Sequence, residues 1–346
     1  MKKSLLIILP VLMLMTLSSC EKEGPVSQEG QEDVQFSISL ENTGTKATNY
    51  TTEFQAERTV NSVHFYVFDS KGRLEAEFDG SKTSAVTKRV STGSKTVWAI
   101  ANISASRFSS CRTLSDFESK EVSFADFTTT NYPMSGKKSV TISTGSNTVT
   151  VAVERFVSRI CIAQVTNMLE GALDSDDLEV TNIFLENVVG NCKVTGAAAS
   201  SLQWYNQCGR RDSNHSYLIS MKSDASYPDF TFDGGSWTTV GWGSTEDFYS
   251  CLYMFPNSST STVCGWSGTF SPRYTRAVIE VCIRDEYYYY PINIVGAKRN
   301  FAYTIYLTIT HLGSLDPDTF NWAEMQDVSI TVGGFDDFDE DFEITY

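Results

Sequence analysis

The chain has 346 residues, with 27 Lys and Arg against 42 Asp and Glu, which gives a formal charge of -15. A chain of this length with 41% hydrophobic residues can bury one large core or two ordinary ones, so disordered, collagen-like and coiled-coil proteins are excluded. The acidity would repel phosphate backbones, so we expect no nucleic-acid partner. The 16 Tyr and 21 Phe, with many Val, Thr and Ser, favour an all-β fold.

The first nineteen residues have the features of an export signal. Two lysines precede an apolar run from Leu5 to Leu17, which is too short to span a bilayer comfortably. The run leads into Ser18-Ser19-Cys20, which resembles the end of a bacterial lipoprotein signal. Cys20 would then carry the lipid (palmitate) and become the new N-terminus. The alternative is an ordinary signal peptide with an incidental cysteine.

The segment behind this cysteine is polar. Glu21-Lys22-Glu23 resembles the acidic signals that send Bacteroidetes lipoproteins to the outer face of the outer membrane. Residues 20–33 contain too little apolar surface to fold, so we expect a solvated tether.

Strand patterns begin directly after this tether. In residues 34–41 the apolar side chains of Val34, Phe36, Ile38 and Leu40 alternate with polar ones, which is typical of a strand with one buried face. Further strands are expected at 63–68, 97–103, 140–142, 149–162, 178–189, 277–283, 287–295 and 301–312. Short helical turns are expected within 113–127, with Ser115 and Ser123 as caps.

The strand pattern lapses between about 163 and 178, where the residues become polar and acidic. We therefore expect two β-sandwich domains, at residues 34–165 and 175–334. Residues 335–346 form a separate acidic segment at the C-terminus.

The number of cysteines is consistent with an exported protein, but it does not show which of them form disulfides. Besides Cys20 there are seven, an odd number without a CxxC pair. Cys161 and Cys282 lie in apolar strand patterns and are expected to be small buried hydrophobic residues. The pairs Cys192–Cys208 and Cys251–Cys264 lie closer to loops, so we expect the disulfides there.

Residue patterns for catalysis or metal binding are absent from the sequence. His64, His215 and His311 each lack a Cys or acid at ligand spacing, and no nucleotide-binding glycine motif occurs. We therefore expect no enzyme activity, no metal site and no cofactor. Trp204, Trp237, Trp242 and Trp266 could form a glycan-binding platform, although Trp more often packs in a core.

Several strings in the chain resemble the fimbrillin family, the type V pilins of Bacteroidetes. They are VHFYVFDSKG at 63–72, VWAIAN at 97–102, YPMSG at 132–136, VERFVSRI at 153–160, LYMFPN at 252–257 and YPINIVGAKRNFAYTIYLTITHLGS at 290–314. They occur along this chain in the same order as in that family. The resemblance implies two transthyretin-like β-sandwich domains with Greek-key character. In VERFVSRI, Arg155 and Arg159 either lie at a sandwich edge or are surface charges with packed aliphatic stems.

The resemblance also implies a mechanism of assembly. Family subunits travel as lipidated precursors, and a trypsin-like protease cuts after a basic residue and frees the first strand. That would leave a sheet without one edge strand, which an extended segment of another subunit then completes. Here the removable strand would carry Phe36, Ile38 and Leu40, and the cut would fall between Lys46 and Ala47. Arg58 is the alternative cleavage site. Relatives use an arginine-specific protease, so a cut after a lysine would be a departure from the family. A further alternative is a lipoprotein that is not cut at all.

The C-terminal segment is the expected donor strand. Phe342, Ile344 and Tyr346 alternate to the last residue, and six acids in the same segment would keep it soluble before docking. The alternative is a final strand that pairs within its own domain.

The resemblance therefore implies a structural fimbrial subunit that supports cell adhesion. Its partners would be other fimbrial subunits, the outer membrane through the lipid on Cys20, and a receptor on a host or bacterial surface. It would lie at the surface of the outer membrane and, after processing, in the fimbrium. The alternative is a surface lipoprotein that does not polymerise, either a pilus anchor or a module that binds glycan or protein.

Overall fold

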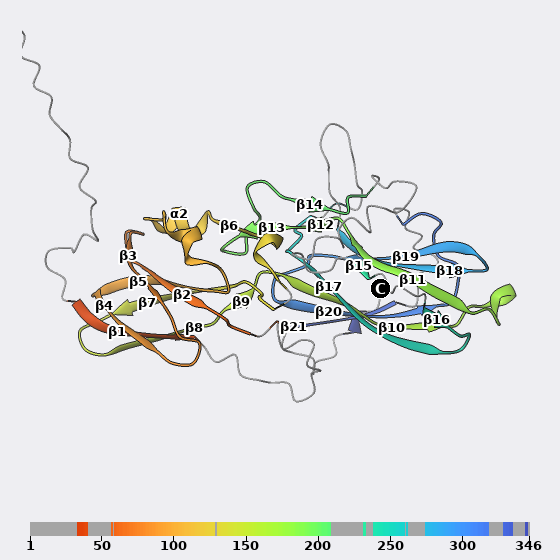
Figure 1. Ribbon diagram of the computed structural model, residues 1–346, viewed down its shortest axis with the longest axis horizontal. Helices are drawn as coiled ribbons and strands as arrows, with labels where there is room; N and C mark the ends of the chain where they lie inside the picture. Colours follow the sequence, from red (N-terminus) through yellow and green to blue (C-terminus); the bar gives the residue numbers. More distant parts are fainter. Residues whose placement is uncertain are drawn as a thin grey trace, which may run out of the picture.

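The computed structural model describes residues 33–40, 57, 59–128, 130–208, 231–232, 238–259, 261, 274–317, 328–334 and 343–344. Nearly all regular structure in these ranges is β-strand, so the all-β prediction is confirmed. The molecule is elongated, with the earlier strands toward one end and the later strands toward the other (Figure 1). Among the helices of the described ranges, none has the length and apolar character needed to cross a membrane.

A first β-sandwich contains most of the strands before residue 156. They are β1 (Asp33–Leu40), β2 (Val63–Phe68), β3 (Leu74–Asp79), β4 (Val86–Ser91), β5 (Gly93–Ala101), β7 (Met134–Ile142), β8 (Asn147–Val151) and β9 (Glu154–Arg155). One sheet has the order β4-β1-β8 and the other has the order β3-β2-β5-β7-β9. Alternating apolar side chains fill the space between the two sheets, with Phe36 and Ile38 of β1 packed in one core with Phe65 and Val67 of β2.

The larger sheet of this sandwich is buried on its other face as well. A covering segment contains η2 (Ala105–Phe108), α2 (Leu114–Glu118), β6 (Glu121–Ser123) and η3 (Phe124–Asp126). Phe117 of α2 packs on Tyr66, with ring centroids 4.8 Å apart. Ser123 is the N-cap of η3, as predicted. The cap predicted at Ser115 is wrong, because α2 begins one residue earlier and Thr113 accepts a hydrogen bond from the N–H of Asp116 (3.1 Å).

A second sandwich follows. Its strands are β10 (Ser158–Asn167), β11 (Leu178–Glu186), β15 (Thr231–Phe232), β16 (Thr238–Val240), β17 (Thr245–Met254), β18 (Thr275–Ile283), β19 (Glu286–Ile294), β20 (Phe301–Ile309), β21 (Val328–Gly334) and β22 (Glu343–Ile344). One sheet has the order β17-β10-β20-β21-β22, and the other has β15-β11-β18-β19 with β16 also paired to β11. Ile162 and Ile305 from the first of these sheets share a core with Ile183 and Ile279 from the second. The 3-10 turn η4 (Gly171–Leu173) connects β10 to β11.

The two sandwiches are joined by more than the chain itself. Between them lie the short strands β12 (Val188–Val189), β13 (Asn191–Lys193) and β14 (Trp204–Tyr205), and β13 pairs with β6. Arg299 reaches across to the carbonyl oxygens of Ser135 (3.0 Å) and Glu154 (2.6 Å) and stacks over the ring of Phe156. The change of sandwich falls between β9 and β10, earlier than the expected domain end at residue 165, because Phe156 and Val157 make the crossing as buried residues without a Gly or Pro signal.

The cysteine pairing differs from the prediction. Cys161 on β10 forms a disulfide with Cys251 on β17, whereas we predicted Cys161 as a free hydrophobic residue and Cys251 as a partner of Cys264. Cys192 is a free thiol, so its predicted bond to Cys208 is also wrong, and Cys208 is disulfide-bonded elsewhere. Cys282 is free and buried, as predicted. Loop proximity was a poor guide because β10 and β17 are neighbouring strands 90 residues apart in the sequence.

Candidate functional site

Strand β1 is the middle strand of its sheet. It runs antiparallel to β4 and parallel to β8, so that Ile38 lies between Val86 on one side and Val149 on the other. The prediction that removal of this strand would leave a sheet without an edge strand is therefore wrong. Loss of β1 would leave a slot between β4 and β8, with unpaired backbone groups along both walls.

The two faces of β1 differ in chemistry. Phe36 and Ile38 are fully buried and Leu40 is half-buried, so the three residues named from the sequence do line the inner face. On the outer face Gln35 is exposed, and the hydroxyl of Ser37 lies 2.8 Å from that of Thr87 on β4. Full burial of one Phe or Ile side chain contributes about 1.5–3 kcal/mol, so a sandwich that loses β1 needs other apolar side chains in these positions.

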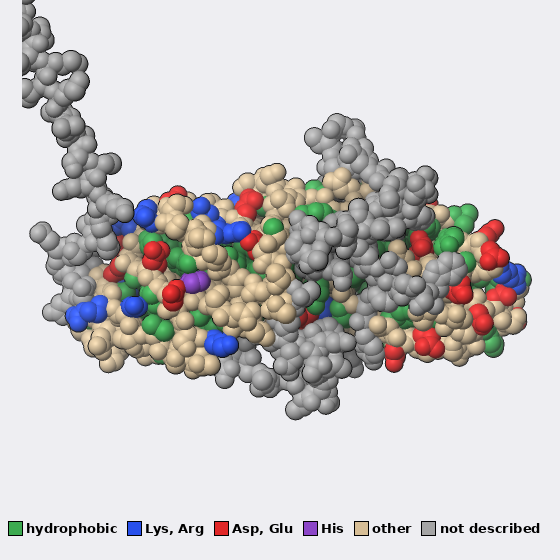
Figure 2. Space-filling view, in the orientation of Figure 1, with side chains coloured by type: hydrophobic (Ala, Val, Ile, Leu, Met, Phe, Trp, Pro, Cys, Tyr) green, Lys and Arg blue, Asp and Glu red, His purple; other side chains and the backbone are tan. Residues whose placement is uncertain are grey.

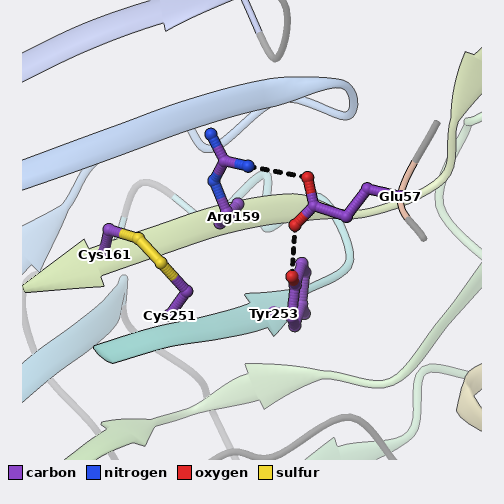
Figure 3. The surroundings of a disulfide bond; sticks show 5 residues. All are labelled: Glu57, Arg159, Cys161, Cys251 and Tyr253. Atoms are coloured by element: carbon purple, nitrogen blue, oxygen red, sulfur yellow. Dashed lines mark hydrogen bonds and ion pairs between the residues drawn. A yellow bond between two sulfur atoms is a disulfide. The ribbon is translucent and has the colours of Figure 1, made fainter. Parts of the chain in front are cut away.

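Glu57, which follows β1 in the sequence, contacts the second sandwich. Its carboxylate accepts hydrogen bonds from Arg159 Nη1 on β10 (2.6 Å) and from Tyr253 Oη on β17 (Figure 3). Its backbone carbonyl accepts a hydrogen bond from Arg155 Nε on β9 (2.7 Å). All four residues are buried. We call Glu57, Arg155, Arg159 and Tyr253 the Glu57 clamp.

Burial dominates the electrostatics of the Glu57 clamp. It raises the pKa of Glu57, while Arg159 and the hydrogen bond from Tyr253 act in the opposite direction. Burial also raises the pKa of Tyr253, and the neighbouring Glu57 carboxylate adds to that rise, so the phenol stays protonated and able to donate. Removing one partner from a buried pair of this kind typically costs about 3–5 kcal/mol, because the remaining charge has no counter-charge.

The sequence did not reveal the Glu57 clamp. The interpretation of Arg155 and Arg159 as surface charges is wrong, because the two residues are 5% and 1% exposed. The sandwich-edge interpretation holds for Arg155, which lies on the edge strand β9, but not for Arg159, which lies on β10 between β17 and β20. A signal was present, since two arginines inside an apolar strand pattern need polar partners once they are buried. The sequence could not show which residue is the partner of Arg159, because the carboxylate that contacts it lies 102 residues earlier in the chain.

Most of the other site residues named from the sequence lie outside the described residues. These are Cys20, Lys46, Ala47, Arg58, Phe342 and Tyr346. Ile344 lies in the short strand β22, where it is opposite Ile330 of β21 in the same chain. Within the described part of the chain no group of His, Cys, Asp and Glu residues could hold a metal ion.

Two of the four tryptophans named as a possible glycan platform lie in the described residues. Trp204 lies on β14, which pairs with β12, and packs against the core. Trp242 lies in the turn between β16 and β17, is 48% exposed, and donates its ring N–H to the carbonyl of Leu169 (2.8 Å). Trp237 and Trp266 lie outside the described residues.

Charge is distributed unequally along the chain. Residues 59–155 contain 12 Lys and Arg against 9 Asp and Glu, whereas residues 156–346 contain 10 against 25. In Figure 2 basic side chains are most frequent over the first sandwich, and acidic ones gather at the far end of the second. Without β1 and the linker that follows it, the first sandwich thus has a small excess of basic residues, whereas the half that ends in the acidic segment is strongly negative.

Comparisons with known proteins agree with this architecture. Residues 34–184 match the family model of the major fimbrial subunit protein (FimA). The search among curated proteins found no match.

Solved structures share the fold at low sequence identity. A candidate cell-adhesion protein from Bacteroides eggerthii has a TM-score of 0.61 and 17% identity, over 90% of this chain and 98% of that one. The fimbrilin FimA from Porphyromonas gingivalis has a TM-score of 0.54 and 14% identity, over 87% of this chain and 96% of that one. The tip fimbrial protein Mfa3 from the same species, truncated at its C-terminus, has a TM-score of 0.51 and 16% identity, over 88% and 100%.

Proposed function

Because residues 34–184 belong to the major fimbrial subunit (FimA) family, we propose that the chain is a structural subunit of a fimbrium that supports cell adhesion. The observation that carries this proposal is the position of β1, an apolar strand held between two neighbours of the same sheet. A strand in this position can leave and be replaced by one of the same pattern, which joins one subunit to the next. This role depends on the binding of one subunit to the next and needs no catalysis.

The proposed path begins with export. The chain leaves the cell as a lipoprotein precursor, anchored to the outer membrane by the lipid on Cys20. A protease then cuts between Lys46 and Ala47 and releases the piece that contains β1. The slot between β4 and β8 opens in the first sandwich, and the two sandwiches act as the two domains of one building block.

The pattern of the C-terminal segment supports it as the donor for this slot. Residues 36–40 read Phe-Ser-Ile-Ser-Leu, and residues 342–346 read Phe-Glu-Ile-Thr-Tyr, so both present Phe, then Ile, then a third apolar residue on one face. Asp341 and Glu343 alternate with that apolar series and would lie on the outer face of a docked strand. This acidic donor would meet a first sandwich in the next subunit that has a small excess of basic residues, with Arg89 of β4 beside the slot.

Determining the mature N-terminus tests the processing step. Intact mass and N-terminal sequencing of fimbriae from cells should give a subunit that begins at Ala47. Lipidated Cys20 on every assembled copy would contradict processing. A second experiment tests the donor: a chain without residues 335–346 should fold but have no donor strand to pass on, so by itself it should stay monomeric. Polymers of this chain alone would exclude the C-terminal donor.

One observation favours a second function. Strand β22 pairs with β21 of its own chain, with Ile330 opposite Ile344 and Thr331 opposite Glu343. A segment that stays there would complete its own sheet, and the chain would be a non-polymerising surface lipoprotein, either a pilus anchor or a glycan- or protein-binding module. Ladders of SDS-resistant oligomers from cells would exclude this alternative.

A further inference from the structure

We propose that the Glu57 clamp determines where the precursor can be cut, by holding the chain next to Arg58 against the second sandwich while the bond after Lys46 stays cleavable. The inference rests on the proposed function in one respect, since it concerns the processing step of that function. It assigns to Glu57, Arg155, Arg159 and Tyr253 a role in choosing between two basic residues of the same linker.

The contacts of Glu57 come from three separate strands. Arg155 belongs to β9, Arg159 to β10 and Tyr253 to β17, and Arg159 and Tyr253 are register partners across the β10–β17 ladder. The disulfide between Cys161 and Cys251 joins the same two strands two residues further along (Figure 3). The Glu57 clamp is therefore built on a cross-linked pair of strands, so its groups are held in place before any cut is made.

A cut after Arg58 would require Glu57 to leave this environment. A protease binds several residues on each side of the bond it cuts, and it binds them in extended form away from the rest of the substrate. Glu57 immediately precedes Arg58, so its carboxylate would have to come away from Arg159 and Tyr253, and its carbonyl from Arg155. On the other side of the bond, the Thr59 carbonyl accepts a hydrogen bond from Asn102 Nδ2 (2.7 Å). Cleavage after Arg58 is then limited by the small fraction of molecules in which the Glu57 clamp and this contact are both open.

Lys46 is not subject to this constraint. It lies eleven residues before Glu57, which is far enough for a protease to bind the linker without disturbing the Glu57 clamp. The two sides of a cut after Lys46 also have different anchors. The upstream piece is held through β1 in the first sandwich, whereas the chain that remains is held through Glu57 on the second sandwich. Release of β1 therefore leaves the retained end attached.

Trypsin tests the proposal because it cuts after both Lys and Arg. The folded full chain is exposed to trypsin briefly, and peptides that end at Lys46 and at Arg58 are quantified by mass spectrometry in the same samples. In the wild-type chain we expect cleavage after Lys46 to be at least about a hundredfold faster than after Arg58. Glu57→Gln should raise the rate after Arg58 about tenfold or more and leave the rate after Lys46 unchanged.

Two further variants make the result specific. Tyr253→Phe keeps the charges of Glu57 and Arg159 and removes only the hydrogen bond from Tyr253, so it should raise the rate of cleavage after Arg58 by a smaller factor. If Glu57→Gln does not fold, the result with Tyr253→Phe tests the proposal instead. Glu53→Gln removes a carboxylate from the same linker and should change neither rate. Equal wild-type rates at the two sites, or an unchanged rate after Arg58 in both Glu57→Gln and Tyr253→Phe, would overturn the proposal.

The same data separate this inference from the proposed function. If folded wild-type chain resists trypsin after Lys46, processing at that site is contradicted, while the comparison of Arg58 cleavage between wild type and Glu57→Gln still decides on the Glu57 clamp. If the chain is cut after Lys46 and the variants do not affect Arg58, the processing step stands and the Glu57 clamp has no part in it.

Discussion

Gln35 on β1 and Arg89 on β4 lie directly opposite each other across the antiparallel ladder, and both side chains are exposed on the outer face of the first sandwich. A donor strand that turns Phe342, Ile344 and Tyr346 inward would place an acid, Asp341 or Glu343, where Gln35 now lies. Opposite charges at directly opposed positions stabilise strand pairing, and like charges weaken it.

Arg89→Glu should therefore slow capture of a donor. We expect a synthetic peptide of residues 335–346 to bind about tenfold more slowly to the Lys46-cleaved variant than to the cleaved wild type at low salt, and the difference should shrink as salt is added. Stopped-flow or surface-binding kinetics would measure this. Lys71→Glu is the matched control, because it makes the same charge change on the exposed β2–β3 turn of the other sheet. An equal effect of both changes would show that only overall charge matters.

Phe36→Ala should destabilise the uncut chain strongly. The side chain is fully buried between the two sheets of the first sandwich, and deleting a buried Phe typically costs about 3–5 kcal/mol. Gln35→Ala, one residue earlier on the exposed face, should cost less than about 0.5 kcal/mol. Guanidinium denaturation of the two variants measures the difference. Similar costs would mean that β1 is not the apolar plug of this sandwich.

Removal of the Cys161–Cys251 disulfide should lower the stability of the second sandwich. The bond closes a segment of 90 residues between neighbouring strands, and the loss of such a bond typically costs about 2–4 kcal/mol. The double change to Ala is compared by denaturation with Cys282→Ala, which deletes a buried free thiol and should cost about 1 kcal/mol. Equal costs would show that the cross-link itself contributes nothing.

The thiols of Cys111, Cys192 and Cys282 should be inert in the folded chain. Burial raises the pKa of all three, that of Cys192 to about 12, so at pH 8 each stays protonated, and the thiolate is the reactive form. Iodoacetamide at pH 8 should therefore label none of them, and all three should react in guanidinium, as counted by mass spectrometry. As the pH is raised with the fold intact, Cys192 should be the last to react. Rapid labelling of folded chain at pH 8 would contradict this.

The sequence by itself determined which faces of the strands are apolar. In β1 the alternation of Val34, Phe36 and Ile38 was sufficient to assign its inner face, because successive side chains of a strand point to opposite sides. In β20 Tyr303, Ile305 and Leu307 alternate in the same way along the sequence, and all three lie in the core. The sequence segments that resemble the fimbrillin family, and the order in which they occur, were sufficient to indicate that family.

The neighbours of each strand were decided only by the tertiary structure. Alternation says which side of β1 is buried but not which strands pair with it, and pairing depends on how distant segments cross over in three dimensions. The sequence therefore could not show that β1 lies between β4 and β8, that Cys161 meets Cys251, or that the buried Arg159 finds its carboxylate in Glu57. Each of these contacts joins residues far apart in the chain, and only the packing of the two sandwiches brings them together.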